Sequence, residues 1–322
     1  MSVQSTKTTT LRVGGSDVTI HPLVLGTNTF NNPTEPREYH KILDGFVERG
    51  GTFMDTADMY SYWVPGNSGG ESETVIGQWL ASRRNRDEVI IATKVSGKPD
   101  LLGLKPETIT RGVEESLRRL QTDYIDVYYA HYQDEETPVE ESAAAFDKLI
   151  TEGKVRSVAL SNFSPEGIDA WFSVAEENGF AKPVALQPQY SLVARGYEQG
   201  LAAAAERHGM GVFPYQVLAG GFLTGKYRTE ADTEGRARGA AVKGYLSPEG
   251  LKVVDALDDV AAQQGTDPAS VALAWAAADN KITAPIAAAT TLTQLDELFA
   301  AAALQLTDEQ IAQLDKASAP FA

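Results

Sequence analysis

The stretches TFMDTADMY (residues 52–60), VIIATK (89–94) and IDVYYAH (125–131) share one design, in which ionisable side chains end or follow a short apolar run. Asp55 and Tyr60 belong to the first stretch, Lys94 ends the second and His131 ends the third. In a barrel of parallel strands, the carboxyl ends of all strands meet at one mouth. We therefore expect these four side chains to share a pocket, although they lie far apart in the sequence.

Five further apolar runs extend this pattern: LVLGT (23–27), VRSVALSN (155–162), VALQPQY (184–190), GVFPYQ (211–216) and TAPIAA (283–288). Longer segments of helical period, such as 38–51, 105–120 and 164–179, alternate with the runs, as in repeated βα units. The eight runs predict an α/β fold, a (β/α)8 TIM barrel that occupies residues 1–322 as a single domain.

Two segments lie outside this repeat. The residues 10–22, TLRVGGSDVTIHP, predict an N-terminal β-hairpin that turns at Gly14–Gly15 and plugs the lower face of the barrel. The polar, glycine-rich segment 220–245 predicts a loop that covers a ligand, with a disordered surface insertion as the alternative. Two helices are expected to follow it.

Composition narrows the functional classes. The 322 residues include 28 Lys and Arg against 44 Asp and Glu, and this net charge of −16 argues against a nucleic-acid partner. The absence of cysteine excludes disulfides and thiolate chemistry, and the four scattered histidines give no metal-ligand spacing. No signal-peptide or membrane-spanning pattern is present, so we expect a cytoplasmic protein without a membrane partner.

The four mouth residues suit proton transfer. A tyrosine with a pKa near 10 is a weak proton donor, and the ammonium of Lys94 would lower the pKa of Tyr60. Asp55 is the expected counter-ion of Lys94, and His131 could polarise a bound carbonyl or shuttle a proton. This set suits carbonyl reduction. Because no side chain can deliver a hydride, the reaction also requires a nicotinamide cofactor.

Each residue alone also has a structural explanation. Asp55 could cap a helix, Lys94 could extend to solvent, and Tyr60 could simply pack in the aromatic cluster 60–63. His131 could be one of the many histidines with a structural role. The conjunction of four suitable residues on three consecutive strands favours a shared site.

The chain resembles the aldo-keto reductase family along essentially its full length, and its bacterial branches most of all. The matching stretches are GGTFMDTADMYS, GNSGGESETVIGQWL, VIIATK, DVYYAH, GKVRSVALSNFSPEGI, ALQPQYSLV, GGFLTGKY and PIAAATTLTQLDE. The resemblance implies that Tyr60 is the general acid in reduction and the general base in oxidation. It also implies that Lys94 and Asp55 tune Tyr60, and that His131 orients the carbonyl.

The resemblance further implies NADP(H) bound across the barrel mouth, with NAD(H) not excluded. Ser161, Asn162 and Gln187 would hold the nicotinamide carboxamide, and Tyr215 would stack on the ring. The other implied cofactor contacts are Thr27 and Asp55 at the ribose, Gln216, Val217, Leu218, Gly220, Lys226 and Arg228 at the phosphates, and Ala289, Thr290, Gln294 and Glu297 at the adenosine end.

Two departures from the family pattern affect specificity. Relatives commonly have Ser-Pro where this chain has Gln216-Val217, and residues 288–294 lack the cation that often binds the 2′-phosphate. The expected substrate is a small-molecule carbonyl or alcohol, with Phe30, Trp63 and Tyr132 as pocket walls. The physiological substrate, reaction direction and oligomeric state stay open.

Two other functions remain possible from the sequence. A barrel lyase could use Lys94 to form a Schiff base. A non-catalytic regulatory subunit could bind the nucleotide as a sensor. Trapping of substrate on Lys94 by borohydride would favour the lyase, and tight cofactor retention without turnover would favour the sensor.

Overall fold

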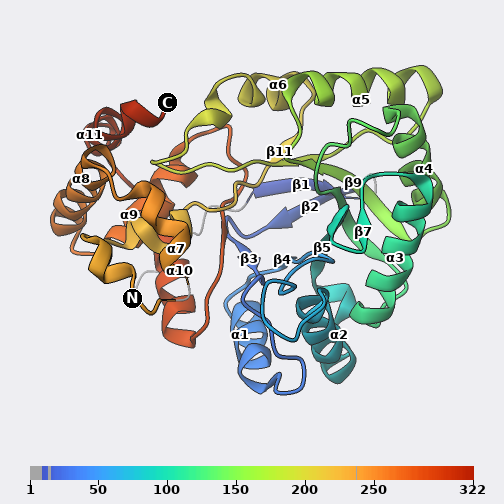
Figure 1. Cartoon of the computed structure of the whole chain (residues 1–322), viewed down its shortest axis with the longest axis horizontal. Coiled ribbons are helices and arrows are strands. Elements are labelled where there is room, and N and C mark those ends of the chain that lie inside the picture. Colours follow the sequence, from blue (N-terminus) through green and yellow to red (C-terminus); the bar gives the residue numbers. More distant parts are fainter. Residues whose placement is uncertain (1–8, 14–15, 237) are drawn as a thin grey trace.

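The computed structural model describes residues 9–13, 16–236 and 238–322, and eight parallel strands form its central sheet (Figure 1). The strand order is β11-β10-β9-β8-β5-β4-β3-β12. The strands are β3 (Val24–Gly26), β4 (Phe53–Asp55), β5 (Ile90–Val95), β8 (Ile125–Ala130), β9 (Val155–Ser161), β10 (Ala185–Gln187), β11 (Gly211–Val212) and β12 (Ile286–Ala287). Each lies within or overlaps one of the eight predicted runs.

Backbone hydrogen bonds close the sheet into a barrel. The N–H of Thr283, just before β12, donates to the carbonyl of Val212 in β11 at 2.9 Å. The N–H of Ile286 in β12 donates to the carbonyl of Pro214, just after β11, also at 2.9 Å. The two outer strands of the sheet order are therefore joined. The predicted TIM-barrel class is confirmed.

The N-terminal hairpin consists of β1 (Thr9–Val13) and β2 (Ser16–Ile20), which pair antiparallel. Val18 and Ile20 pack with the apolar cluster that fills the barrel interior, which includes Phe53 and Phe213. The hairpin therefore plugs the barrel as predicted. The predicted turn at Gly14–Gly15 lies outside the described residues.

Helices surround the strands (Figure 1). Ser164, Ser247 and Asp267 cap α5, α8 and α9 through their side-chain oxygens, and a proline follows each cap. The helices are α1 (Arg37–Glu48), α2 (Glu71–Arg83), α3 (Pro106–Leu120), α4 (Val139–Thr151), α5 (Pro165–Asn178), α6 (Leu201–Arg207), α7 (Gly239–Val242), α8 (Pro248–Gln264), α9 (Pro268–Ala278), α10 (Leu292–Ala303) and α11 (Asp308–Ser318). None of these described helices is long and apolar enough to cross a lipid bilayer.

The segment 220–245 is more ordered than a loop. It contains the 3₁₀ turns η3 (Ala219–Thr224), η4 (Glu230–Thr233) and η5 (Lys243–Tyr245) as well as α7. Phe222 and Leu223 are fully buried in the main core, where η3 contacts α8 and α9. A disordered insertion is therefore the wrong interpretation of its described residues, because apolar anchors within the polar sequence fix the segment.

A charged cluster lies at the amino ends of the strands. Asp126 near the start of β8 accepts hydrogen bonds from Arg86 and Arg156 at 2.6 and 2.8 Å. Both guanidinium groups also stack on the ring of Tyr124, at 3.8 and 3.9 Å from its centroid. The cluster ties together the approaches to β5, β8 and β9.

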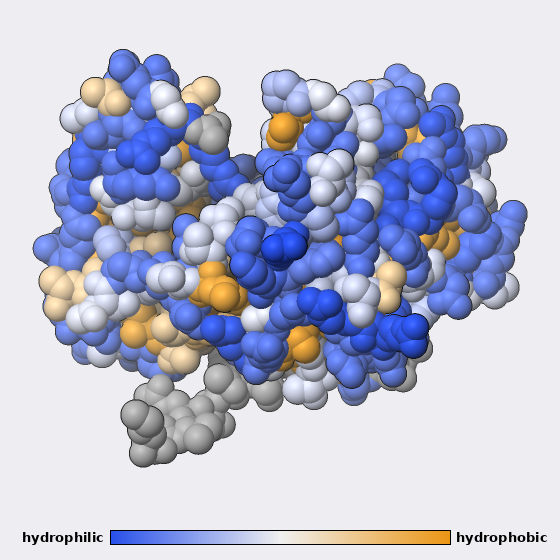
Figure 2. Space-filling view, turned by 90° about the horizontal axis from the view of Figure 1, so that it is seen from below, coloured by the Kyte–Doolittle hydropathy of each residue, from blue (hydrophilic) through white to orange (hydrophobic). Residues whose placement is uncertain are grey.

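Hydrophilic residues predominate on the face of the molecule shown in Figure 2, with small scattered hydrophobic patches.

Candidate active site

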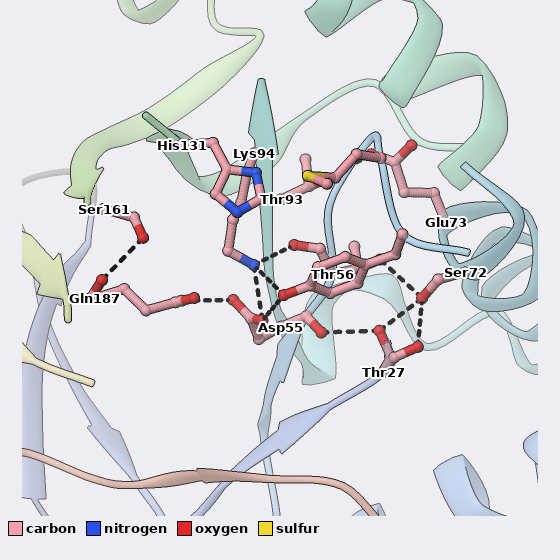
Figure 3. Close-up of polar contacts among 12 residues, drawn as sticks. Thr27, Asp55, Thr56, Ser72, Glu73, Thr93, Lys94, His131, Ser161 and Gln187 are labelled. Atoms are coloured by element: carbon pink, nitrogen blue, oxygen red, sulfur yellow. Dashed lines mark hydrogen bonds and ion pairs between the residues drawn. The ribbon is translucent and has the colours of Figure 1, made fainter. Parts of the chain in front are cut away.

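The barrel brings the four predicted side chains together at the carboxyl ends of its strands, and Figure 3 labels Asp55, Lys94 and His131 among them. Asp55 ends β4, Lys94 lies near the end of β5, His131 follows β8, and Tyr60 lies in the loop after β4. The Nζ atom of Lys94 is 2.8 Å from both Asp55 Oδ2 and Tyr60 Oη. The rings of Tyr60 and His131 face each other edge-on, with centroids 6.5 Å apart.

Lys94 is a buried ammonium group. Its side chain has 0% exposure and donates to Asp55 Oδ2, Tyr60 Oη and the Thr56 carbonyl, the last at 2.7 Å. Three acceptors match the three N–H donors of an ammonium group, whereas a neutral amine has only two. Burial lowers the pKa of Lys94, and the adjacent Asp55 opposes that shift. The alternative that Lys94 extends to solvent is wrong.

Asp55 uses both carboxylate oxygens inside the site. Oδ2 accepts from Lys94 and from the Tyr60 hydroxyl, at 2.8 and 3.1 Å, and Oδ1 accepts from Gln187 Nε2 at 2.8 Å. No helix N-terminus contacts either oxygen among the described hydrogen bonds, so Asp55 does not serve as a helix cap.

The pKa of Tyr60 shifts in the direction opposite to the prediction. Burial, the charge of Asp55 and the hydrogen bond to Asp55 together raise the pKa of Tyr60 well above its ordinary value. We expected Asp55 to act on Lys94 as its counter-ion, whereas the fold also places the Asp55 carboxylate where it accepts the phenolic proton. Tyr60 is therefore held protonated, the state that a proton donor requires.

His131 is a neutral imidazole. Burial, followed by the positive charge of Lys94, lowers the pKa of His131 well below its ordinary value. Its ring stacks on Tyr132 with a centroid distance of 4.5 Å, and its buried Nδ1 atom has no hydrogen-bond partner. A neutral imidazole keeps one N–H donor for a carbonyl oxygen.

Strained backbone gathers at the same end of the barrel. Of the seven described non-glycine residues with positive φ, Arg84 and Gln121 end helices α2 and α3. The other five are Ser61, Ser96, Asn162, Gln216 and Ala219, at 78°, 98°, 55°, 56° and 48°. Each of these residues follows the carboxyl end of a barrel strand. Non-glycine residues adopt such angles at a free-energy cost of about 1–3 kcal/mol, and such strain concentrates at functional sites.

The predicted carboxamide contacts form a hydrogen-bonded group. Ser161 Oγ donates to the Gln187 carbonyl at 2.8 Å, and Asn162 Nδ2 donates to Ser161 Oγ and to the His131 carbonyl at 3.1 and 2.8 Å. The Tyr215 hydroxyl donates to Asn162 Oδ1 at 2.7 Å. A cavity of about 380 Å³ borders Asn162 and Tyr215, and none of the four mouth residues is among its lining residues.

The predicted ribose contact, Thr27, is fully buried. Its hydroxyl donates to the Asp55 carbonyl at 2.8 Å and lies 2.7 Å from Ser72 Oγ. Ser72 also receives a hydrogen bond from Thr56 at 2.8 Å. Thr27 thus fixes the backbone of Asp55.

The two predicted cationic phosphate contacts differ in whether their charge is already paired with a carboxylate. Lys226 is exposed, and its Nζ atom lies 5.1 Å from the Tyr227 ring, with no carboxylate at salt-bridge distance among the described residues. Arg228 instead forms ion pairs with Asp255 and Asp258 on α8. Because α8 begins well after Arg228 in the sequence, charge alone did not reveal this pairing.

The other predicted phosphate and adenosine contacts lie on two segments. Gln216 is exposed, Leu218 and Gly220 are half-buried, and Val217 is buried. At the start of α10, Gln294 Oε1 accepts from the N–H and hydroxyl of Thr290 at 2.8 and 2.9 Å. Ala289 is buried, and Glu297 is exposed.

Two of the three predicted pocket walls stand at the mouth. Trp63 is 50% exposed and lies edge-on to Tyr60, and Tyr132 is 42% exposed. Phe30 is a correction, because its ring is fully buried against Tyr39 and packs in the core. Tyr62, which contacts Trp63, extends the exposed aromatic surface instead.

The site also contains groups that sequence reasoning missed. Glu73 on α2 is fully buried and accepts hydrogen bonds from Thr93 and Arg119, both at 2.6 Å. Thr93 and Lys94 are neighbours on β5, so Glu73 contacts the same strand that carries Lys94 (Figure 3). The available signal was a glutamate on the same buried helix surface as Val75 and Ile76. No group of three or more potential metal ligands occurs among the described residues.

The mouth of this parallel barrel holds a buried ammonium, a protonated tyrosine and a neutral histidine, a set of groups that is able to move protons. The aldo/keto reductase family model matches residues 22–319. The chain therefore belongs to the aldo/keto reductase family, and the oxidoreductase class follows from this membership.

Similar proteins span nearly the whole chain. The chain is 33% identical to an uncharacterized oxidoreductase, YrpG, of Bacillus subtilis, with 94% of each protein covered. It is 31% identical to Protein tas of Escherichia coli, covering 94% of this chain and 96% of that protein. It is also 31% identical to norsolorinic acid reductase of Aspergillus flavus, covering 94% and 79%.

Proposed function

We propose that the protein is an NADP(H)-dependent oxidoreductase that reduces aldehyde, ketone or sugar carbonyls to alcohols, or catalyses the reverse oxidation. The observation that carries this proposal is the hydrogen-bonded series Gln187–Asp55–Lys94–Tyr60 beside neutral His131. It provides a protonated acid, a fixed positive charge and a neutral donor in one pocket. Family membership and the reductase relatives support the same chemistry.

The residues divide the proton chemistry among them. A bound reduced nicotinamide would supply the hydride. Tyr60 transfers its proton to the carbonyl oxygen, and the ammonium of Lys94, 2.8 Å away, stabilises the tyrosinate that remains. His131 donates its N–H to the same oxygen and orients the carbonyl. In alcohol oxidation the tyrosinate accepts the proton back.

The residues at the mouth fit a nicotinamide cofactor by their chemistry. Ser161, Asn162 and Gln187 offer hydroxyl and amide groups to the carboxamide, and Tyr215 offers a flat ring for stacking. For the phosphates, Lys226 is the cation without a carboxylate partner within the predicted contacts that the structure describes. Because the pyrophosphate is common to NADP(H) and NAD(H), Lys226 would hold either cofactor, and the proposed preference for NADP(H) rests on family membership.

The two alternatives receive less support. A Schiff-base lyase needs a neutral lysine nucleophile, whereas Lys94 donates to three acceptors as an ammonium group. A nucleotide sensor needs no proton donor, whereas Tyr60 retains partial access to solvent beside the exposed ring of Trp63.

The test combines binding and turnover. Fluorescence titrations with NADPH and NADH measure affinity, and a panel of aldehydes, ketones and sugars is then screened by the absorbance of the reduced cofactor. We expect tighter binding of NADPH and carbonyl-dependent oxidation of it. Binding without turnover across the panel would favour the sensor, and borohydride trapping of substrate on Lys94 would favour the lyase.

A further inference from the structure

The side chain of Gln187 faces the catalytic carboxylate. Its Nε2 atom lies 2.8 Å from Asp55 Oδ1, and both residues are 2% exposed (Figure 3). A carboxylate only accepts hydrogen bonds, so the amide nitrogen must be the atom that faces Asp55. The amide oxygen of Gln187 therefore stays available for another donor, such as the carboxamide assigned above.

The backbone fixes this orientation. Gln187 ends β10 and pairs in register with Ser161 of β9. Ser161 Oγ donates to the Gln187 carbonyl at 2.8 Å. The amide thus projects from a rigid strand end across the barrel mouth to the end of β4, where Asp55 lies.

The hydrogen bond from Gln187 to Asp55 affects the negative charge that lies beside Tyr60. Asp55 is the one carboxylate that accepts a hydrogen bond from Tyr60 among the described contacts, and its negative charge disfavours the tyrosinate. An N–H donor on Oδ1 draws electron density from the carboxylate and away from Oδ2, which faces Tyr60 and Lys94. Without this donor, the full charge would act on the phenol.

We infer that Gln187 is a positioning residue that sets the pH at which Tyr60 releases its proton, by acting through Asp55. This inference rests on the proposed function of Tyr60 and adds a role to the cofactor contact assigned to Gln187. It also connects the nicotinamide contacts to the acid, because Ser161, Asn162 and Tyr215 join Gln187 in one hydrogen-bonded group.

Other charged and titratable groups surround the Gln187–Asp55 pair. Burial and the charge of Asp55 raise the pKa of Tyr129, and the Gln187 side chain opposes this shift, so Tyr129 also responds when Gln187 is replaced. The charges of Asp58 and Glu73 act to raise the pKa of Lys94. Tyr132 and Tyr215 act to raise the pKa of Tyr60. The remaining titratable side chains close to the pair are His131 and Tyr129, whose rings adjoin Tyr60 and Lys94 respectively.

The first experiment compares pH profiles of kcat for alcohol oxidation in the wild type, Gln187→Met and Gln187→Glu. Oxidation requires the tyrosinate, so its rate rises as pH passes the pKa of Tyr60. Methionine keeps the length of glutamine but lacks the donor. We expect its profile to move to higher pH by about one unit, the scale of a lost hydrogen bond to a charged group.

The glutamate variant sharpens the test through its own titration. When ionised, the introduced carboxylate adds negative charge beside Asp55 and moves the oxidation profile to still higher pH. When protonated at acid pH, it can donate to Asp55 as the amide did. Carbonyl reduction by Gln187→Glu should therefore approach the wild-type rate at acid pH, which a purely structural role would not produce.

A second measurement covers the case in which Gln187→Met binds cofactor poorly. Tyr60 is replaced by 3,5-difluorotyrosine, whose fluorines lower the pKa of the phenol, and its ionisation is followed by ¹⁹F NMR in the cofactor-free protein. Gln187→Met should again raise the midpoint. Gln310→Met is the matched control, because Gln310 is a buried glutamine on α11 that bonds only to Gln263, Gln264 and Thr307.

The outcomes separate the two claims. An unshifted ¹⁹F midpoint in folded Gln187→Met would overturn the inference, even if turnover is normal. A shifted midpoint in a protein that oxidises no cofactor with any carbonyl would support the link to Tyr60 while refuting the proposed function.

Discussion

The two ends of strand β8 carry polar groups that serve opposite purposes. At its amino end, Asp126 satisfies Arg86, Arg156 and the Ile91 N–H with its two oxygens, and both guanidinium groups stack on Tyr124. At its carboxyl end, the strand presents His131 with an unpartnered Nδ1 atom.

The difference lies in how completely each cluster is neutralised. The amino-end cluster pairs its charges across three strand approaches. None of its own residues has a positive φ, although Arg84 and Gln121, which end α2 and α3 nearby in the sequence, do. The mouth combines a buried ammonium, a phenol held protonated and strained backbone at Ser96 and Asn162. We therefore expect mutations at the amino end to change stability and mutations at the mouth to change turnover.

The largest expected effect is that of Lys94→Met on turnover. The tyrosinate formed in reduction would lose its stabilising charge, and kcat should fall by about 10²–10⁴-fold. Asp55 would also be left as a buried, unpaired carboxylate at a cost of about 3–5 kcal/mol in the free energy of unfolding. Steady-state kinetics and denaturant unfolding measure the two effects.

A double variant separates charge from fold in that experiment. Asp55→Asn combined with Lys94→Met removes both charges and should recover most of the lost stability while kcat stays low. Recovery of kcat in the double variant would show that the ammonium does not act on Tyr60.

The next largest effect is expected at the opposite end of β8. Asp126→Ala leaves the Ile91 N–H without its acceptor and Arg86 with only neutral acceptors, and should lower the free energy of unfolding by about 3 kcal/mol. The kcat of the folded fraction should stay within about twofold of the wild type, since the change lies at the stability end of the barrel. A large fall in kcat with an unchanged free energy of unfolding would contradict the assignment of the amino end of β8 to stability.

A smaller effect is expected at the aromatic wall. Trp63→Ala removes an exposed ring that lies 6.2 Å from Tyr60, centroid to centroid. The KM for an aromatic aldehyde should rise by about tenfold, with a smaller change for a short aliphatic aldehyde, because the lost contact is apolar. Equal changes for both would mean that Trp63 acts on the acid rather than on the substrate.

The smallest effect concerns acid stability. Burial lowers the pKa of His131 in the folded state. Above the unfolded pKa of about 6.5 the histidine is neutral in both states, so it does not change the free energy of unfolding there. Below that pH the unfolded chain binds the proton first, and stability falls by up to about 1.4 kcal/mol per pH unit for this histidine. His131→Gln should flatten the fall in the free energy of unfolding between about pH 6.5 and 5, measured with urea.

Much of the fold could be predicted from the sequence because its signals are local. Each barrel strand is a short apolar run, and the side chains that end the runs, such as Asp55 and Lys94, necessarily reach one mouth in a parallel barrel. The hairpin of β1 and β2 was predictable because the sequence 10–22 has two adjacent glycines between two short runs that contain β-branched residues.

The predictions that were wrong depended on contacts between residues distant in the sequence and on burial. Arg228 looked free until the fold placed Asp255 and Asp258 beside it. Phe30 looked like a pocket wall, but packing against Tyr39 buries it. The sign of the pKa shift of Tyr60 depended on which atom of Asp55 accepts its proton and on the depth of the site, and neither is encoded in local pattern.

The central claim is that the Tyr60 hydroxyl transfers the proton during carbonyl reduction. Its most direct test measures carbonyl-dependent NADPH oxidation and NADPH affinity side by side in the wild type and Tyr60→Phe. We predict that removing one oxygen atom lowers kcat by about 10³-fold while the dissociation constant for NADPH changes little. Undiminished turnover in Tyr60→Phe would contradict the claim.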